Sequence, residues 1–161
     1  MSPEEKMQQD LSNKFKYLEG AVKVTRARRV FLEVAYSHFR EVFECAVKEL
    51  SFPHFLMITG LDDGENLSLI YHLAHESGLV LNIKTSVPRT SPVVATVTDL
   101  FVNAEAYERE VVDLFGFTVE GLGKANRYPL PDTWPAGQYP LRKDWKPESL
   151  DAATAKKSGC A

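Results

Sequence analysis

The sequence has few of the residues from which redox centres, disulfide frameworks and membrane anchors are built. It contains only two cysteines, Cys45 and Cys160, which are far apart. Two thiols do not make a disulfide framework or supply the four ligands of an iron–sulfur cluster, so we expect no such cluster in this chain and a reducing, cytosolic compartment. No apolar run approaches the ~20 residues that a membrane-spanning helix needs. The polar, acidic stretch 1–10 does not have the pattern of a signal peptide.

An excess of positive charge is also missing. The formal net charge is −3 over 161 residues, which gives no general attraction to nucleic acid. Arg26, Arg28 and Arg29 form a basic cluster, but interleaved aromatic residues and a nucleic-acid-reading motif are absent. We interpret the cluster as a solvated hairpin turn or as a contact with an acidic partner. We therefore predict no nucleic-acid partner.

The histidines do not predict a metal site. His72 and His75 have a spacing that binds metal when both lie on a helix. We place them in a strand, where residues three apart point to opposite faces of the sheet. His38 and His54 are isolated, and Cys45 lies in an apolar helical pattern typical of a core residue. We expect no metal bound to this chain.

The remaining pattern predicts one folded domain over residues 1–123. Hydrophobic residues make up 44% and charged residues 25%, as in ordinary globular proteins, and the length is sufficient for a core. Ser2, Pro3 and Glu5 predict the start of a helix that continues to about Leu18. Ser37 is the predicted N-cap of a second helix. Further elements are predicted strands at 21–25, 29–36, 55–58, 67–73 and 79–85, and a short helix that begins at Pro92. This order favours an α+β fold: two layers, with a mixed, largely antiparallel sheet and helices on one face.

A charged amphipathic helix is predicted at 104–115. Asn103 is a candidate N-cap, and Gly116 is a candidate C-terminal stop. Glu105, Arg109 and Asp113 are spaced by four, so Arg109 can pair with a carboxylate on either side. The apolar face is predicted to contain Tyr107, Val111, Leu114 and Phe115.

The carboxylates of this helix allow two interpretations. Glu108, Glu110 and Asp113 can serve as acid–base groups of an enzyme, or they can form an ion-pair network with cations of the tail or of a partner. A histidine, cysteine or serine nucleophile is absent from the neighbouring sequence. We favour the ion-pair network, with Arg142 and Lys143 as complementary charges.

Residues 124–161 are predicted to form an extended tail. Five prolines between Pro129 and Pro147 exclude a helix there. Ordering such a segment costs on the order of 1–2 kcal/mol per residue, which the burial of its aromatic side chains roughly offsets. We expect the chain from about Arg127 onward to leave its own domain and run along a larger partner, with Trp134, Tyr139 and Trp145 as anchors and Arg142 and Asp144 in charged contacts.

The same residues resemble the signature of the complex I 30-kDa subunit family, the C-type subunits of NADH dehydrogenase. That signature has Glu-Arg-Glu, two residues, then Asp-Leu/Met-Phe-Gly, followed by Leu-Pro-x-x-Trp and Pro-Leu-Arg-Lys-Asp-aromatic. The matching residues are Glu108, Arg109, Glu110, Asp113, Phe115, Gly116, Leu130, Pro131, Trp134, Pro140, Leu141, Arg142, Lys143, Asp144 and Trp145.

The resemblance implies a cofactor-free, non-catalytic subunit of the peripheral arm of a complex I-like membrane-bound redox complex. Its tail would lie on the large catalytic subunit, the homologue of the 49-kDa subunit or of a hydrogenase large subunit. The expected interface is Glu108, Arg109, Glu110, Asp113, Arg127, Trp134, Tyr139, Arg142, Lys143, Asp144 and Trp145. Iron–sulfur clusters, with a nickel–iron centre in the hydrogenase branch, would belong to the large and small partner subunits. The chain would be held at the cytoplasmic side of the membrane, in contact with the membrane arm only through those partners.

Two departures from the family pattern refine the resemblance. Gly121-Leu122-Gly123 replaces Gly-His-Pro, and Asn126 replaces one of two arginines while Arg127 remains. The motif Trp-Pro-x-Gly-x-Tyr-Pro, from Trp134 to Pro140, resembles that of the branch found in energy-converting membrane-bound hydrogenases and ferredoxin-linked complexes. The alternatives are a subunit of an NADH– or F420–quinone oxidoreductase and, more remotely, a free-standing enzyme that uses the carboxylates.

Overall fold

In the computed structural model, which describes residues 2–124 and 127–150, the chain divides into two units. Unit 1 contains the chain to Thr59 together with Ser68–Val87, and unit 2 contains Gly60–Leu67 and the chain from Pro88 onward. A short hairpin end, 60–67, is thus grouped with the C-terminal half of the sequence. The predicted division at residue 123, between a folded domain and a partner-binding tail, stays a prediction.

A five-stranded sheet carries unit 1, in the order β1-β2-β5-β4-β3. β1 is antiparallel to β2, and β2 is parallel to β5. β3 and β4 are joined only by residues 63–65, and β4 and β5 only by residues 75–79, so each pair must run antiparallel. The mixed, largely antiparallel sheet is therefore confirmed. The strands are β1 Val22–Arg26, β2 Arg29–Glu33, β3 His54–Asp62, β4 Asn66–Ala74 and β5 Val80–Pro88.

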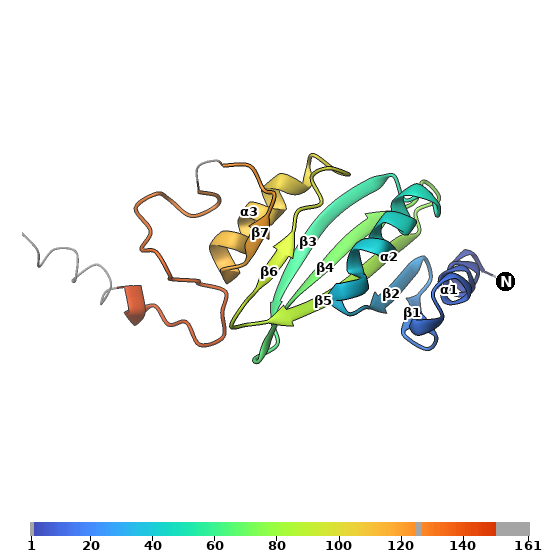
Figure 1. Ribbon diagram of the computed structural model, residues 1–161, viewed down its shortest axis with the longest axis horizontal. Helices are drawn as coiled ribbons and strands as arrows, with labels where there is room; N and C mark the ends of the chain where they lie inside the picture. Colours follow the sequence, from blue (N-terminus) through green and yellow to red (C-terminus); the bar gives the residue numbers. More distant parts are fainter. Residues whose placement is uncertain (1, 125–126, 151–161) are drawn as a thin grey trace, which may run out of the picture. The chain divides into compact units, whose positions relative to one another are not determined.

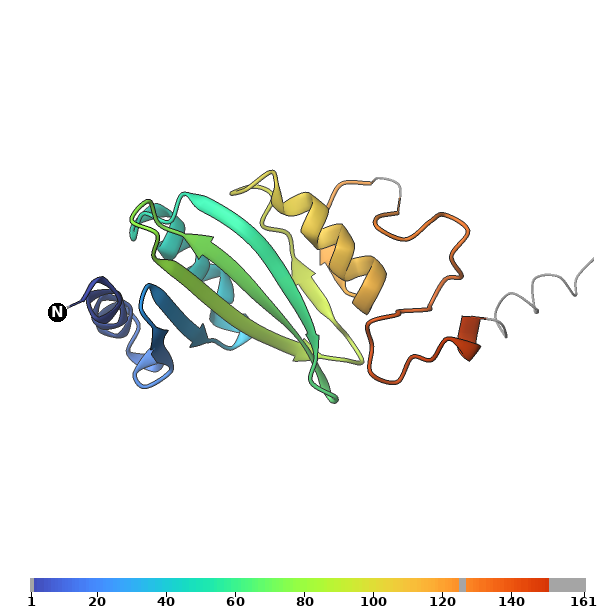
Figure 2. The same cartoon turned by 180° about the vertical axis from the view of Figure 1, so that it is seen from behind.

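Helices α1 (Pro3–Lys14) and α2 (Tyr36–Lys48) complete unit 1. The predicted capping box at Ser2 is present: Glu5 N donates to Ser2 Oγ at 3.2 Å, and Ser2 N donates to the Glu5 carboxylate at 2.7 Å. α2 lies across one face of the sheet (Figure 1), and the ring of Phe39 packs 4.5 Å from that of Tyr71 in β4. Seen from behind, the sheet lies in front of this helix (Figure 2).

Unit 2 is built around a strand–helix–strand segment. Helix α3 (Ala104–Phe115) connects β6 (Val93–Ala95) to β7 (Thr118–Glu120), and the two strands are parallel, with Val94 opposite Val119. A parallel pair requires a crossover of this kind, so α3 is the crossover helix. The helix predicted at 104–115 is confirmed. The sequence analysis did not predict that it connects two paired strands.

Several predicted boundaries are wrong. The helix predicted from Pro92 is strand β6, because the β-branched Val93 and Val94 pair with β7 and not with a following helical turn. Ser37 is not an N-cap, since α2 begins at Tyr36 after Ala35, which makes no side-chain cap. The first helix stops at Lys14 and a 3₁₀ turn covers Lys16–Leu18. The strand predicted at 55–58 extends over His54–Asp62.

Candidate functional site

The C-terminal end of α3 is where the helix of the sequence signature meets the tail. Gly116 adopts the left-handed conformation, with φ 76°, and ends the helix as predicted. A Cβ at Gly116 would lie 2.5 Å from the ring of Tyr139 and 2.8 Å from Nη2 of Arg142. Glycine is therefore required here twice, by the backbone and by the tail that crosses directly over it.

The tail satisfies the free carbonyl groups at this helix end. Arg142 Nε donates to Phe115 O at 2.6 Å, and Leu141 N donates to Leu114 O at 3.1 Å. The guanidinium of Arg142 also lies 4.5 Å from the centre of the Tyr139 ring. A cation at a helix C-terminus interacts favourably with the helix dipole. Arg142 thus pairs with backbone and an aromatic ring, not with the carboxylates that we expected it to complement.

Asp113 fixes the beginning of the tail. Its carboxylate accepts from Arg127 Nε at 3.1 Å and from Leu130 N at 3.2 Å, and its side chain is 7% exposed. Arg127 also donates through Nη1 to Trp134 O at 2.8 Å. One buried carboxylate therefore orders two points of the tail. The predicted ion pair between α3 and the tail exists at Asp113, although its cation is Arg127 and not Lys143.

Glu108 has a different role from the predicted ion pairing. It is 2% exposed and accepts hydrogen bonds from Thr96 Oγ1 at 2.6 Å and Val97 N at 2.7 Å. Burial raises the pKa of the Glu108 carboxyl, and these two hydrogen bonds oppose the rise without cancelling it. Both donors are neutral and belong to the chain just after β6. Glu108 thus joins α3 to that chain, which places a carboxylate on the core face of the helix.

Of the other charged residues of α3, Glu105 and Arg109 form an ion pair, and Glu110 is unpaired among the described residues. Arg109 pairs with Glu105, one turn earlier on the helix, as the spacing predicted. Its guanidinium does not pair with Asp113, which bonds Arg127 instead. Glu110 is half-buried, and its carboxylate has no hydrogen bond or ion pair with the described residues. Asn103 occupies the N-cap position of α3 without making the predicted side-chain cap.

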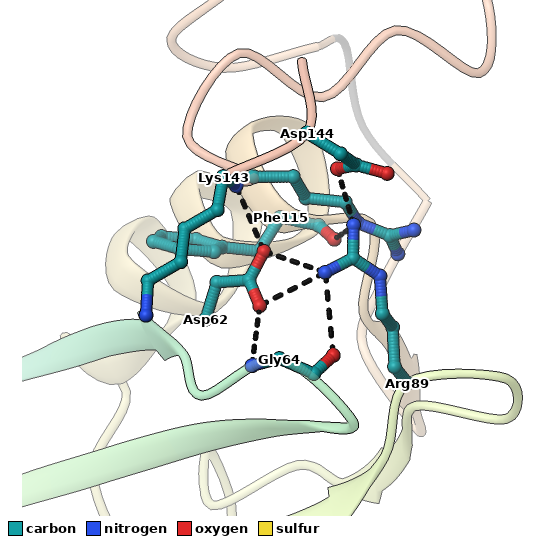
Figure 3. Close-up of polar contacts among 7 residues, drawn as sticks. Asp62, Gly64, Arg89, Phe115, Lys143 and Asp144 are labelled. Atoms are coloured by element: carbon teal, nitrogen blue, oxygen red, sulfur yellow. Dashed lines mark hydrogen bonds and ion pairs between the residues drawn. The ribbon is translucent and has the colours of Figure 1, made fainter.

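A second anchor, centred on Asp62, was not predicted. Its carboxylate accepts from Lys143 N at 2.8 Å, from Gly64 N at 2.9 Å and from Arg89 Nη1 at 2.7 Å (Figure 3). Arg89 also pairs with Asp144, so the tail is held both through a backbone amide and through an ion pair. The Asp62 side chain is only 1% exposed. We call Asp62, Arg89, Lys143 and Asp144 the tail clamp.

The electrostatics of the clamp favour an ionised carboxylate. Burial by itself raises the pKa of Asp62, but the hydrogen bonds from the Lys143 and Gly64 amides and the charge of Arg89 outweigh it, so the pKa is lowered. The carboxylates of Asp144 and Asp62 raise the pKa of Arg89 in spite of its burial. At neutral pH Asp62 and Arg89 therefore form a charged pair, and the amides of Gly64 and Lys143 donate hydrogen bonds to its carboxylate.

The aromatic anchors of the tail pack on each other. The ring centres of Trp134 and Trp145 are 6.1 Å apart, and both indole N–H groups donate to Gln138, at 2.9 Å to its O and at 3.0 Å to its Oε1. Both tryptophans and Tyr139 remain half-buried. The expectation that the chain from Arg127 leaves its own domain did not include these contacts, nor the bonds to Asp113, Phe115 and Asp62 that hold the tail to other segments of unit 2. Binding of the exposed parts to a partner stays a prediction.

His72 and Cys45, which the sequence analysis considered as metal ligands or core residues, have ordinary structural roles. His72 bridges Thr59 at 2.9 Å and Asn82 at 2.7 Å within the sheet, and Cys45 is buried. Among the described residues, no group of three or more histidine, cysteine, aspartate or glutamate side chains is placed to hold a metal ion. None of the helices formed by residues 2–124 and 127–150 is long and apolar enough to cross a membrane. Asn126, Cys160 and the segment 151–161 lie outside the described residues.

Comparison with known proteins places most of the chain in one family. The sequence model of "Respiratory-chain NADH dehydrogenase, 30 Kd subunit" matches residues 32–150. The C subunit of F(420)H(2) dehydrogenase from Methanosarcina mazei is 30% identical over 141 residues, covering 86% of this chain and 89% of that protein. The beta subunit of the membrane-bound hydrogenase from Pyrococcus furiosus is 28% identical, covering 93% and 91%.

A solved structure agrees with these matches. One chain of the membrane-bound sulfane sulfur reductase (MBS), described as an archaeal respiratory membrane complex, superposes with a TM-score of 0.80 at 33% identity, covering 94% of this chain and 91% of that chain. Other relatives are C/D subunits of NADH-quinone oxidoreductase. This chain covers only 24% of the one from Escherichia coli O6:K15:H31, at 30% identity.

Proposed function

Because the chain belongs to the 30-kDa subunit family of respiratory-chain NADH dehydrogenase, we propose that it is a structural subunit of a membrane-bound, complex I-like oxidoreductase complex. It carries no redox cofactor in this proposal. Its work is to dock on the large catalytic subunit and to hold that subunit in the peripheral arm, on the cytoplasmic side of the membrane. Iron–sulfur clusters and any nickel–iron centre belong to the large and small partner subunits.

One observation carries the proposal: Glu108, Asp113 and Arg142 of the signature bond to other side chains and to backbone of this same chain. Asp113 orders two points of the tail and Asp62 a third, Arg142 covers the end of α3, and Glu108 holds the chain after β6. Their hydrogen-bonding capacity is used in making a surface of defined shape. An acid–base site would instead need a carboxylate directed at a substrate.

The large subunit is the proposed partner for two reasons. In the C/D relative, the region similar to this chain is continuous with a much longer polypeptide, so its neighbour there is a large protein. In this chain, Tyr128 and Leu141 of the tail remain 52% and 51% exposed beside ordered anchors. Exposed large apolar groups on an ordered frame are typical of a protein interface.

The proposal names a class of complex and leaves its electron donor and acceptor open. The relatives named for F(420)H(2) dehydrogenase and for membrane-bound hydrogenase match at 30% and 28% identity over similar shares of the chain. The structural subunit is therefore compatible with either chemistry, which the partner subunits perform.

The test is purification of the chain alone and together with the products of its neighbouring genes. Alone, the chain should contain no stoichiometric iron, nickel or zinc after chelation, show no visible absorption and turn over no electron donor. Co-expressed and tagged, it should retain the large subunit through size-exclusion chromatography. Metal held by its own side chains, or a tagged chain that retains no large subunit, would contradict the proposal.

A further inference from the structure

A hollow of about 400 Å³ beside α3 in unit 2 has an excess of positive charge. Arg109, Lys124 and Arg127 line it, with the carboxylate of Asp113 as their counter-charge. A smaller hollow of about 280 Å³ shares Arg109 and Arg127 and adds Glu105. Three cations thus face two carboxylates, which leaves one positive charge over the combined surface. We call the two hollows the cationic groove.

These cations have donors that the chain does not use. Arg127 bonds Asp113 through Nε and Trp134 O through Nη1, and Nη2 has no bond with the described residues. Arg109 bonds only Glu105 among the described residues, and its Nε is buried without a partner there. Lys124 is exposed, and its ammonium has no hydrogen bond or ion pair within the described part of the chain.

The walls of the groove are apolar. Val112, Phe117 and Leu122 line the larger hollow, and Tyr128, a residue that is 52% exposed, lines both hollows. A carboxylate among the cations would lie in a partly dehydrated site, where charge-assisted hydrogen bonds are stronger than in water. The volume suits one acidic side chain and an apolar neighbour and exceeds what a single small anion fills.

We propose that the cationic groove receives one aspartate or glutamate side chain, flanked by an apolar residue, from the large partner subunit. This inference rests on the proposed function and adds the surface and the chemistry of contact. Its basis is charge complementarity: one uncompensated positive charge, unused N–H donors on three side chains and an apolar wall. The guanidinium of Arg127 is held in place by Asp113, so it presents Nη2 from a fixed position.

The test uses the assembled complex, purified through a tag on its large subunit. A zero-length carbodiimide joins a lysine amine to a carboxylate in direct contact with it. Mass spectrometry should find Lys124 joined to an aspartate or glutamate of another subunit. Lys124→Glu should weaken retention of this chain by about tenfold or more, because it places a like charge against that carboxylate.

Two further variants separate the contact from general charge effects. Lys23→Glu, on the exposed side of β1 in unit 1, makes the same change in net charge and should leave retention unchanged. Changing the cross-linked partner carboxylate to lysine should weaken retention with the wild-type chain and restore it with Lys124→Glu. Tryptophan emission of each isolated variant chain reports whether its tail is still folded, since both tryptophans of the chain lie in the tail.

Other outcomes overturn the inference in distinguishable ways. The complex could assemble fully without a Lys124 cross-link and retain the Lys124→Glu chain as well as wild type. These two results would refute the proposed contact at Lys124 and leave the proposed function standing. In the isolated chain, millimolar inorganic phosphate could protect the Lys124 amine from chemical modification. If it does so, and the complex shows no Lys124 cross-link, the groove is a site for a free anion and not for a partner carboxylate. The isolated chain could bind phosphatidylglycerol vesicles, and Lys124→Glu could abolish that binding. This pair of results would assign the cationic groove to the membrane surface. Absence of the wild-type chain from the material purified through the large-subunit tag contradicts the proposed function itself.

Discussion

The tail clamp makes the stability of the tail depend on one carboxylate. In Asp62→Asn the side chain keeps its shape and one acceptor oxygen, but it loses its charge and brings an N–H₂ group toward donors. Lys143 N, Gly64 N and Arg89 all point at this carboxylate. One backbone amide would then face the N–H₂ group without an acceptor, and Arg89 would lose one of its two carboxylate counter-charges, in a site where the Asp62 side chain is 1% exposed.

The expected loss follows from this burial. Breaking a buried ion pair costs about 3–5 kcal/mol. Arg89 keeps Asp144 and is 20% exposed, so water and the second carboxylate reduce the penalty to about 3 kcal/mol, the lower end of that range. With a urea m-value of about 1–3 kcal/mol/M, the unfolding midpoint of the tail should fall by about 1–3 M.

The assay uses the two tryptophans as a local probe. Trp134 and Trp145 are the only tryptophans of the chain, so their emission follows the tail, while far-UV circular dichroism follows the whole chain. Asp62→Asn should lower the urea midpoint seen by emission more than the midpoint seen by dichroism. Glu65→Gln, at an exposed position of the same turn, is the control and should change neither. An unchanged emission midpoint in Asp62→Asn would refute the clamp.

The remaining predictions concern α3. Burial raises the pKa of Glu108 above its ordinary value of 4.5, so the native state binds this proton more tightly than the unfolded chain does, and stability falls as pH rises from about 4.5 toward the raised pKa. Urea unfolding at several pH values should show that fall in wild type and a flatter profile in Glu108→Gln; equal profiles would contradict it. Gly116→Ala should destabilise the tail by about 1–3 kcal/mol, measured by tryptophan emission, because its Cβ would lie 2.5 Å from the Tyr139 ring. Gly20→Ala, with φ 78° but open space around the Cβ, is the matched control and should show only the smaller backbone strain.

The sequence predicted those parts of the structure that depend on local pattern. The capping box at Ser2, the left-handed stop at Gly116 and the Glu105–Arg109 pair all involve residues within four positions of each other. The alternation of apolar residues predicted the mixed sheet, since strands with one buried face carry that period. Short-range rules were sufficient for each of these features.

The clamp could not be predicted, because its partners are far apart in the chain. Asp62 and Lys143 are 81 positions apart, and no short-range pattern of the sequence connects them. Glu108 was predicted to form ion pairs, but its two donors are neutral and lie just beyond a strand that the sequence analysis had assigned to a helix. That error concealed both the βα crossover and the reason for a buried carboxylate on α3.

The most direct test of the structural role separates the amount of complex from its activity. In a host that lacks this chain, wild type, Asp62→Asn and Arg109→Ala are each supplied on a plasmid, and both assembled complex and electron-transfer rate are measured. The account predicts less assembled complex with each variant, while the turnover of each assembled complex equals that of wild type. Normal amounts of assembled complex with abolished turnover would show that these residues take part in the chemistry, and would contradict the account.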